Sequence, residues 1–240
     1  MSDRQQILQA IASLEAQRNV LGDAVVDTAI APLKQKLASL DTPQQQRKLV
    51  SVIFADLAGF KAISERLDPE VVREIQQAYF DAVTAPIQEQ GGKVEKYIGD
   101  AILAVFGLPH SREDDPERAL RAALGMQSAL AQLNEKLASD KDLQLHMRVG
   151  VNTGWVAVDM QGEQEFVVTG DAVNLASRLQ ALASPESILI SHDTYQHVRG
   201  VFDVQSLEPV QIKGKSDPVQ VYTVLRPKPR AFRLPTRGVE

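Results

Sequence analysis

The order of strand-like and helix-like segments between residues 47 and 225 constrains the fold of this chain more than any other feature. β-rich and helical patterns succeed one another over 49–56, 68–92, 93–98, 101–107, 114–138 and 143–160. The order strand, helix, strand, strand, helix, strand is that of the split-βαβ, or ferredoxin-like, arrangement. We therefore predict an α+β fold: a ferredoxin-like βαββαβ core with helices on one face, an extended antiparallel sheet, and an N-terminal helical segment before it.

Local signals predict several boundaries within this core. Asp68 followed by Pro69 is typical of the first turn of a helix, so the first long helix should begin there. Gly99-Asp100 lies between two β-rich runs and suits a two-residue hairpin turn. The stretch Asn152-Thr153-Gly154 indicates a second break, which would divide residues 143–160 into two strands.

The two ends of the chain differ from residues 47–225. In residues 1–46 the apolar residues recur at helical spacing, which predicts two short amphipathic helices that meet near Gly22. Such helices must bury their apolar stripes, either on their own domain or as an arm for dimerisation or regulation. Residues 226–240 combine basic residues with three prolines and indicate a linker or tail.

Composition narrows the classes of function. The net charge of −5, without a basic patch in the folded part, argues against a nucleic-acid partner. The chain contains no cysteine, which excludes disulfides and thiolate metal sites. No apolar run approaches the ~18 residues of a membrane helix, and the N-terminus lacks the apolar core of a signal peptide. We therefore expect a cytoplasmic protein without membrane insertion.

Two carboxylates stand where strands are expected to end. Asp56 follows an apolar run, and Asp100 lies at the tip of the predicted hairpin. If these strands are antiparallel neighbours, both side chains reach the same end of the sheet, where their repulsion requires a cation between them. Oxygen ligands suit Mg²⁺ or Mn²⁺. Taken singly, each aspartate is more often a turn or cap residue than a metal ligand, and only their joint placement at adjacent strand ends makes the two interpretations about equally favoured.

The residues after Asp56 add a candidate phosphate site. Ala58, Gly59 and Phe60 lead into a helical stretch, so that backbone N–H groups and a helix N-terminus are available to face a phosphate. Divalent cations beside such donors are the arrangement used for phosphoryl or nucleotidyl transfer.

Five stretches of the chain carry a recognisable pattern. They are VIFADLAGF (52–60), KYIGDAILAVFG (96–107), RVGVNTG (148–154), GDAVNLASRL (170–179) and IKGKSDPVQVY (212–222). In order and spacing they resemble the catalytic domain of class III nucleotidyl cyclases, the adenylyl and guanylyl cyclase family. The resemblance implies a catalytic domain over 47–225, with the helical arm (1–46) and the tail (226–240) outside it.

The resemblance implies a metal site and a catalytic pair. Asp56 and Asp100 match the aspartates that hold two divalent cations, Mg²⁺ or Mn²⁺, in each active site. Asn174 matches the asparagine that positions the ribose, and Arg178 matches the arginine that binds the pentavalent phosphate. Their spacing of four places both on one face of a helix, which Asp171 could cap.

The resemblance also implies substrate contacts. Lys96 matches the lysine that contacts the purine, and it points to ATP because guanylyl cyclases commonly have glutamate there. Lys213 matches a lysine that contacts the triphosphate, with Lys215 as the less secure alternative. The second purine contact falls on Val167, which cannot hydrogen-bond a base, so GTP or relaxed purine choice stays an alternative.

Finally, the resemblance implies a homodimer, because in this family each active site takes residues from two domains. The metal aspartates come from one domain, and the purine lysine and the Asn/Arg helix come from the other. Since this chain carries both sets, two copies would form two complete sites. The predicted function is that of an adenylate cyclase, which converts ATP to 3′,5′-cyclic AMP and pyrophosphate. A non-catalytic, cyclase-like nucleotide-binding signalling module is the alternative of another class, although such modules lose residues that are present here.

Overall fold

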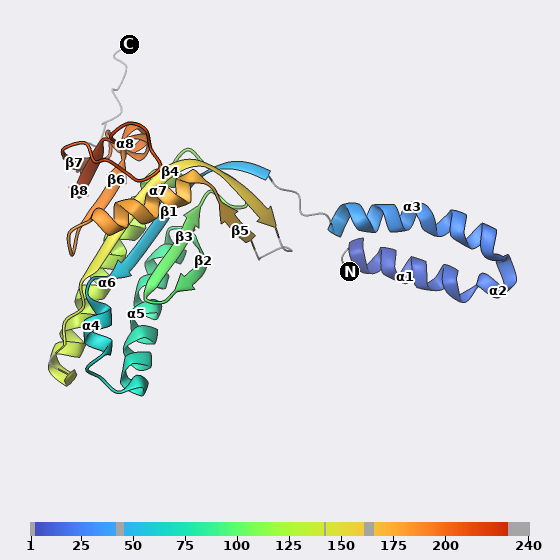
Figure 1. Cartoon of the computed structure of the whole chain (residues 1–240), viewed down its shortest axis with the longest axis horizontal. Helices are drawn as coiled ribbons and strands as arrows, with labels where there is room; N and C mark the ends of the chain where they lie inside the picture. Colours follow the sequence, from blue (N-terminus) through green and yellow to red (C-terminus); the bar gives the residue numbers. More distant parts are fainter. Residues whose placement is uncertain (1–2, 42–45, 142, 161–165, 230–240) are drawn as a thin grey trace, which may run out of the picture.

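The computed structural model describes residues 3–41, 46–141, 143–160 and 166–229 (Figure 1). The helices are α1 (Asp3–Ala16), α2 (Arg18–Leu21), α3 (Asp23–Asp41), α4 (Phe60–Ser64), α5 (Pro69–Glu89), α6 (Asp115–Lys141), α7 (Asp171–Leu182) and α8 (His192–Val198). The strands are β1 (Gln46–Leu57), β2 (Lys93–Ile98), β3 (Ala101–Phe106), β4 (Met147–Met160), β5 (Phe166–Thr169), β6 (Ile188–Ser191), β7 (Phe202–Ser206) and β8 (Val221–Pro227).

One sheet organises the chain from β1 onward. Its strands lie in the order β2-β3-β1-β4-β6-β8-β7, and β5 pairs with β4 beside this path. The first four strands, with α5 and α6, follow the predicted order βαββαβ, and β1 lies between β3 and β4 as the ferredoxin-like arrangement requires. The α+β prediction is confirmed.

The residues of β1 alternate between two apolar layers. Ile53, Ala55 and Leu57 pack with α5 and α6 in one buried cluster. Val50 and Val52 point the other way and pack with α7 in a second cluster. This alternation is that of a strand buried on both faces.

Three details differ from the expectations. First, α7 covers the second face of the sheet, so helices do not lie on one face only. Second, β6 pairs parallel to β4, so the extension is not wholly antiparallel. Third, β4 is continuous through Asn152-Thr153-Gly154, which were expected to break it.

Tertiary partners explain the continuity of β4. The Thr153 hydroxyl lies 2.9 Å from the hydroxyl of Ser51 on β1, and the Asn152 amide donates to the Ala172 carbonyl on α7 at 3.0 Å. Because their polar groups are satisfied inside the protein, these residues stay in a buried strand.

Other boundaries agree with the sequence. Helix α5 begins at Pro69 with Asp68 as its N-cap residue, and Gly99-Asp100 form the two-residue connection between β2 and β3. At α7, however, the N-cap residue is Gly170, and Asp171 is the first helical residue.

The N-terminal helices pack on each other. Ile7 of α1 and Val26 and Ile30 of α3 are buried, as their helical spacing predicted. Arg18 forms ion pairs with Glu15, Asp23 and Asp27 around the connection. Figure 1 draws α1 and α3 side by side and away from the sheet.

The close approach of α7 to β4 depends on a glycine. A Cβ on Gly150 would lie 2.2 Å from the Ala176 carbonyl oxygen and 2.3 Å from the Gln180 nitrogen. Both contacted atoms belong to the backbone of α7, so no flexible side chain can move aside to make room. We therefore expect Gly150→Ala to lower the free energy of unfolding by about 3 kcal/mol, measured as a shift of the urea midpoint.

Gly200→Ala is the control, because a Cβ there meets no atom within 4 Å. It should change the free energy of unfolding by less than about 0.5 kcal/mol. Equal urea midpoints for the two variants would contradict this account of the α7–β4 contact.

Candidate active site

The two predicted metal aspartates lie at the same end of the sheet. Asp56 stands near the end of β1, and Asp100 stands in the connection between β2 and β3. The backbone N–H of Leu57, the residue after Asp56, donates to Asp100 Oδ2 at 3.3 Å. The antiparallel β1–β3 pairing thus brings together two carboxylates that are 44 residues apart in the sequence.

Arg148 balances the charge of Asp56 and was not predicted to be part of the site. Its Nε lies 3.1 Å from Asp56 Oδ1 and its Nη2 lies 2.9 Å from Asp56 Oδ2, an arrangement of two parallel bonds. The two residues are direct partners in the β1–β4 register. Arg148 begins the motif RVGVNTG, but its pairing with Asp56 follows only from the register of β4 against β1, which the sequence did not provide.

A buried tyrosine lies under the acidic pair. Tyr79 of α5 has no exposed surface, and among the described residues its hydroxyl has no hydrogen-bond partner. Burial first, and then the negative charges of Asp56 and Asp100, raise the pKa of Tyr79. Its hydroxyl therefore stays neutral and adds no third negative charge to the site.

Two carboxylates suit a hard divalent cation that takes its remaining ligands from a phosphate and from water. Within the described ranges, no group of three or more acidic, histidine or cysteine side chains gathers as a metal cage. Mg²⁺ is commonly held by one or two carboxylates, with phosphate and water oxygens completing its coordination. Asp56 and Asp100 fit that role.

The predicted phosphate donors after Asp56 are only partly available. The N–H of Ala58 donates to the His146 carbonyl at 2.7 Å and is therefore already used, which corrects the expectation for this residue. Gly59 adopts a left-handed conformation with φ of 74° and is the N-cap residue of the short helix α4. The side chain of Phe60 is buried in the core below.

A basic group forms around α7 and residues 212–215. Asn174 and Arg178 lie one turn apart on α7. A Cβ on Gly214 would lie 3.5 Å from Nη1 of Arg178, so the segment that carries Lys213 runs beside this guanidinium. Lys213 is exposed, whereas the ammonium of Lys215 pairs with the carboxylate of Asp171. This pairing favours Lys213 over Lys215 as a free cation.

The candidate purine contacts lie on β2 and β5. Lys96 is half-exposed on β2. Val167 is partly buried on β5, opposite Asp159 of β4. The neighbouring N–H of Val168 donates to the carboxylate of Glu95 on β2 at 3.3 Å, so β5 and β2 are directly connected here.

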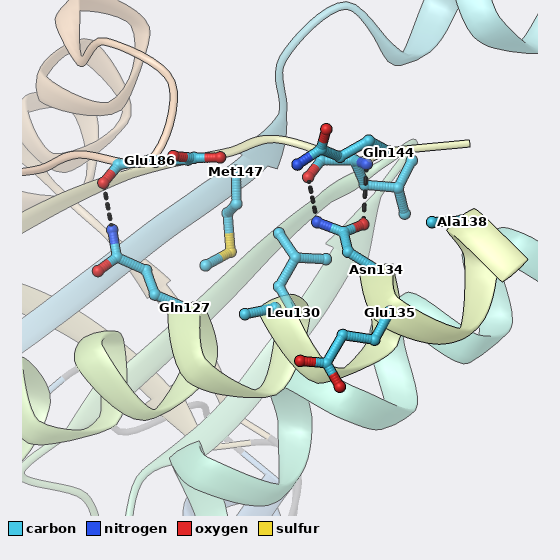
Figure 2. Close-up of a pocket in the computed structure, with 10 residues that line it drawn as sticks. Gln127, Leu130, Asn134, Glu135, Ala138, Gln144, Met147 and Glu186 are labelled. Carbon is cyan, nitrogen blue, oxygen red and sulfur yellow. Dashed lines mark hydrogen bonds between the residues drawn. The ribbon is translucent and has the colours of Figure 1, made fainter. Parts of the chain in front are cut away.

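A separate cavity of about 590 Å³ lies between α6 and the start of β4 (Figure 2). Asn134 exchanges hydrogen bonds of 2.8 and 2.9 Å with the backbone of Leu145, and Gln127 donates to the Glu186 carbonyl at 2.7 Å. These bonds fasten α6 to the segments that lead into β4 and β6. Because none of the predicted site residues lines this cavity, we do not place the active site there.

Comparisons with known proteins agree with the fold and the motifs. Residues 42–226 match the family model of the adenylate and guanylate cyclase catalytic domain. An adenylate cyclase of Anabaena cylindrica is 27% identical over 82% of this chain and 40% of its own length. A putative adenylate cyclase of Rhizobium meliloti is 30% identical over 81% of this chain and 31% of its own length.

Solved structures include both kinds of cyclase. The adenylyl cyclase CyaB of P. aeruginosa matches with a TM-score of 0.73 and 30% identity, over 78% of this chain and 98% of that one. The guanylyl cyclase Cya2 matches with a TM-score of 0.73 and 32% identity, over 79% of this chain and 98% of that one.

The chain belongs to the family of adenylate and guanylate cyclase catalytic domains, the class III nucleotidyl cyclases. The predicted resemblance is confirmed. The chain spans less than half of the length of the curated relatives described above. The family uses divalent metal ions, binds nucleotide substrates and works as dimers. In the described part of the chain, no helix has the combination of length and apolar character needed to cross a bilayer.

Metal binding tests the acidic pair directly. A cation that binds only the folded protein raises its melting temperature with concentration. We expect Mn²⁺ to stabilise the protein in this way, and Asp100→Asn to require at least about tenfold more Mn²⁺ for the same shift, because one of two carboxylate ligands is lost.

Glu135→Gln is the matched control, since Glu135 is an exposed carboxylate on α6. Its response to Mn²⁺ should equal that of the wild-type protein. An unchanged response of Asp100→Asn would remove Asp100 from the metal site.

Proposed function

We propose that this domain is an adenylate cyclase that converts ATP to 3′,5′-cyclic AMP and pyrophosphate at a site shared by two chains. The observation that carries the proposal is the presence, in one chain, of an acidic pair at the end of β1 and a basic group around α7. In the reaction the ribose 3′-oxygen forms a bond to the α-phosphorus and its proton is released. The bond from that phosphorus to the bridging oxygen breaks, and pyrophosphate leaves.

The acidic pair would hold Mg²⁺ or Mn²⁺, two per site. Such cations, when bound, neutralise phosphate charge, favour ionisation of the 3′-hydroxyl and stabilise the leaving pyrophosphate. Asp56 and Asp100 supply carboxylate oxygens at one sheet end. Arg148, which donates to both Asp56 oxygens, would keep a positive charge beside the carboxylate that holds the cation.

The basic group would act on the other side of the triphosphate. The guanidinium of Arg178 is permanently charged and has donors spaced for phosphate oxygens, which suits a pentavalent phosphate. Asn174, one turn earlier, can position the ribose from the same helix face. Lys213 is exposed on the segment that runs beside Arg178 and would contact the outer phosphates.

The orientation of α7 supports a shared site. Ala172 and Ala176 pack against the sheet, whereas Asn174 and Arg178 each lie two positions further on, about 200° around the helix. Arg178 therefore points away from the sheet that carries Asp56, and the helix separates it from phosphates held by its own chain. A homodimer can place the α7 of one chain over the acidic pair of the other.

Lys96 favours ATP as the substrate because an ammonium can donate to adenine N1, whereas guanine carries a hydrogen there. Val167 is the specific observation that keeps GTP as a second candidate, since an apolar side chain replaces the second polar contact.

The N-terminal helices would form a dimerisation or regulatory arm ahead of the catalytic domain. Apolar side chains on this arm remain exposed, among them Val20 at 85% and Val25 at 57%. The arm leads towards β1, which carries Asp56, so its packing against a second chain could bias how two domains close. A cytoplasmic location stays a prediction.

Product analysis tests the proposal. Incubation with ATP and Mg²⁺ or Mn²⁺ should yield 3′,5′-cyclic AMP and pyrophosphate in equal amounts, and the same incubation with GTP should yield less cyclic product. Asp56→Ala should lower the rate by at least about a thousandfold, because the loss of a metal ligand removes most of the phosphate charge stabilisation.

Glu135→Gln should keep the wild-type rate, which controls for the loss of an acidic side chain as such. Absence of cyclic product from any purine nucleotide, in a folded protein that binds Mn²⁺, would refute the proposed activity.

A further inference from the structure

An irregularity in β2 places two consecutive side chains on one side of the strand. In the pairing with β3, Val94 lies opposite Ala104 and Lys96 lies opposite Leu103, so Glu95 is an extra residue. In a regular strand the side chains of neighbours point to opposite faces, but at a β-bulge this alternation is interrupted. The side chains of Glu95 and Lys96 can therefore meet, and Glu95 Oε1 lies 3.4 Å from Lys96 Nζ.

Glu95 is an unusual residue for an edge strand because its side chain is only 2% exposed. Oε1 also accepts the hydrogen bond from the Val168 N–H on β5, at 3.3 Å. Oε2 is buried and, among the described residues, has no hydrogen-bond partner. A buried carboxylate requires a compensating cation, and the ammonium of Lys96 is positioned to provide it.

The ion pair restricts the side chain of Lys96 more than that of Glu95, which is already buried. The side chain of Lys96 is 48% exposed, and a lysine with that exposure ordinarily samples many rotamers. The buried carboxylate of Glu95, which the Val168 N–H holds in place, limits the positions that the ammonium group of Lys96 can take. Lys96 is thus held near β5, where the family pattern expects a second purine contact and this chain has Val167.

We propose that Glu95 is a positioning residue for purine recognition, which holds the Lys96 ammonium in place of the polar side chain that position 167 lacks. The inference rests on the proposed function, since it concerns the nucleotide bound at that site. A fixed ammonium donates to N1 of adenine but meets the N1–H donor of guanine. Glu95 therefore strengthens the preference for ATP without contacting the reacting atoms.

The test compares Glu95→Gln with the wild-type protein, because glutamine keeps the size of the side chain and an acceptor for Val168 but removes the charge. We expect KM for ATP to rise about tenfold with kcat changed less than about twofold, since recognition and not chemistry is affected. The ratio of kcat/KM for ATP to that for GTP should fall by about tenfold. Displacement of a fluorescent ATP analogue by ATP and by GTP measures the same change without turnover.

Rescue separates positioning from a structural effect. Val167→Asp, added to Glu95→Gln, returns a carboxylate from the adjacent β5 and should restore most of the preference for ATP. Asp159→Asn is the matched control: this residue also has a buried carboxylate oxygen without a partner in the described structure, but the ion pair of Lys96 is with Glu95 and not with Asp159. It should leave the ATP to GTP ratio unchanged.

The outcomes are distinct from those that test the proposed function. A folded Glu95→Gln variant with the wild-type ATP to GTP ratio, in turnover and in displacement, would overturn the inference while cyclase activity stands. Displacement of the analogue continues to test it if no cyclic product forms. If Glu95→Gln fails to fold, Glu95→Asp, which withdraws the charge by one methylene, is measured in the same way and must also lower the ratio.

Discussion

The pairing of β1 with β4 is the interaction on which the rest of the molecule depends. Twelve consecutive residue pairs, from Gln46 opposite Val158 to Leu57 opposite Met147, join these two central strands. Their register sets Asp56 beside Arg148, and it places Gly150 where α7 crosses the sheet. The acidic end of the sheet and the helix that carries the basic group are thus both positioned by one antiparallel ladder.

The sequence predicted the elements well where the signal was local. The βαββαβ order, the start of α5 after Asp68 and the hairpin at Gly99-Asp100 follow from spacing and turn chemistry. The break expected at Asn152-Thr153-Gly154 was wrong because its polar groups find partners on β1 and α7, which no local pattern reveals. The parallel pairing of β6 and the cover of α7 likewise depend on distant contacts.

Some residues of the candidate site could likewise be predicted from local sequence signals, and others could not. Asp56 and Asp100 could be predicted because each stands at a strand end, whereas Arg148 and Glu95 could not. Arg148 requires the register of β4, and Glu95 requires a bulge that shifts β2 by one residue. The roles of the site residues, and the division of each site between two chains, remain proposals supported by the outward orientation of α7.

The most direct measurement of the central claim mixes chains with complementary defects. Neither Asp100→Ala nor Arg178→Ala should be active alone, but an exchanged mixture should recover about a quarter of wild-type activity, because half of the dimers contain one intact site. Wild-type chains mixed with the double variant should form inactive heterodimers. No recovery in the first mixture, with active heterodimers in the second, would show that each chain completes its own site and would contradict the account.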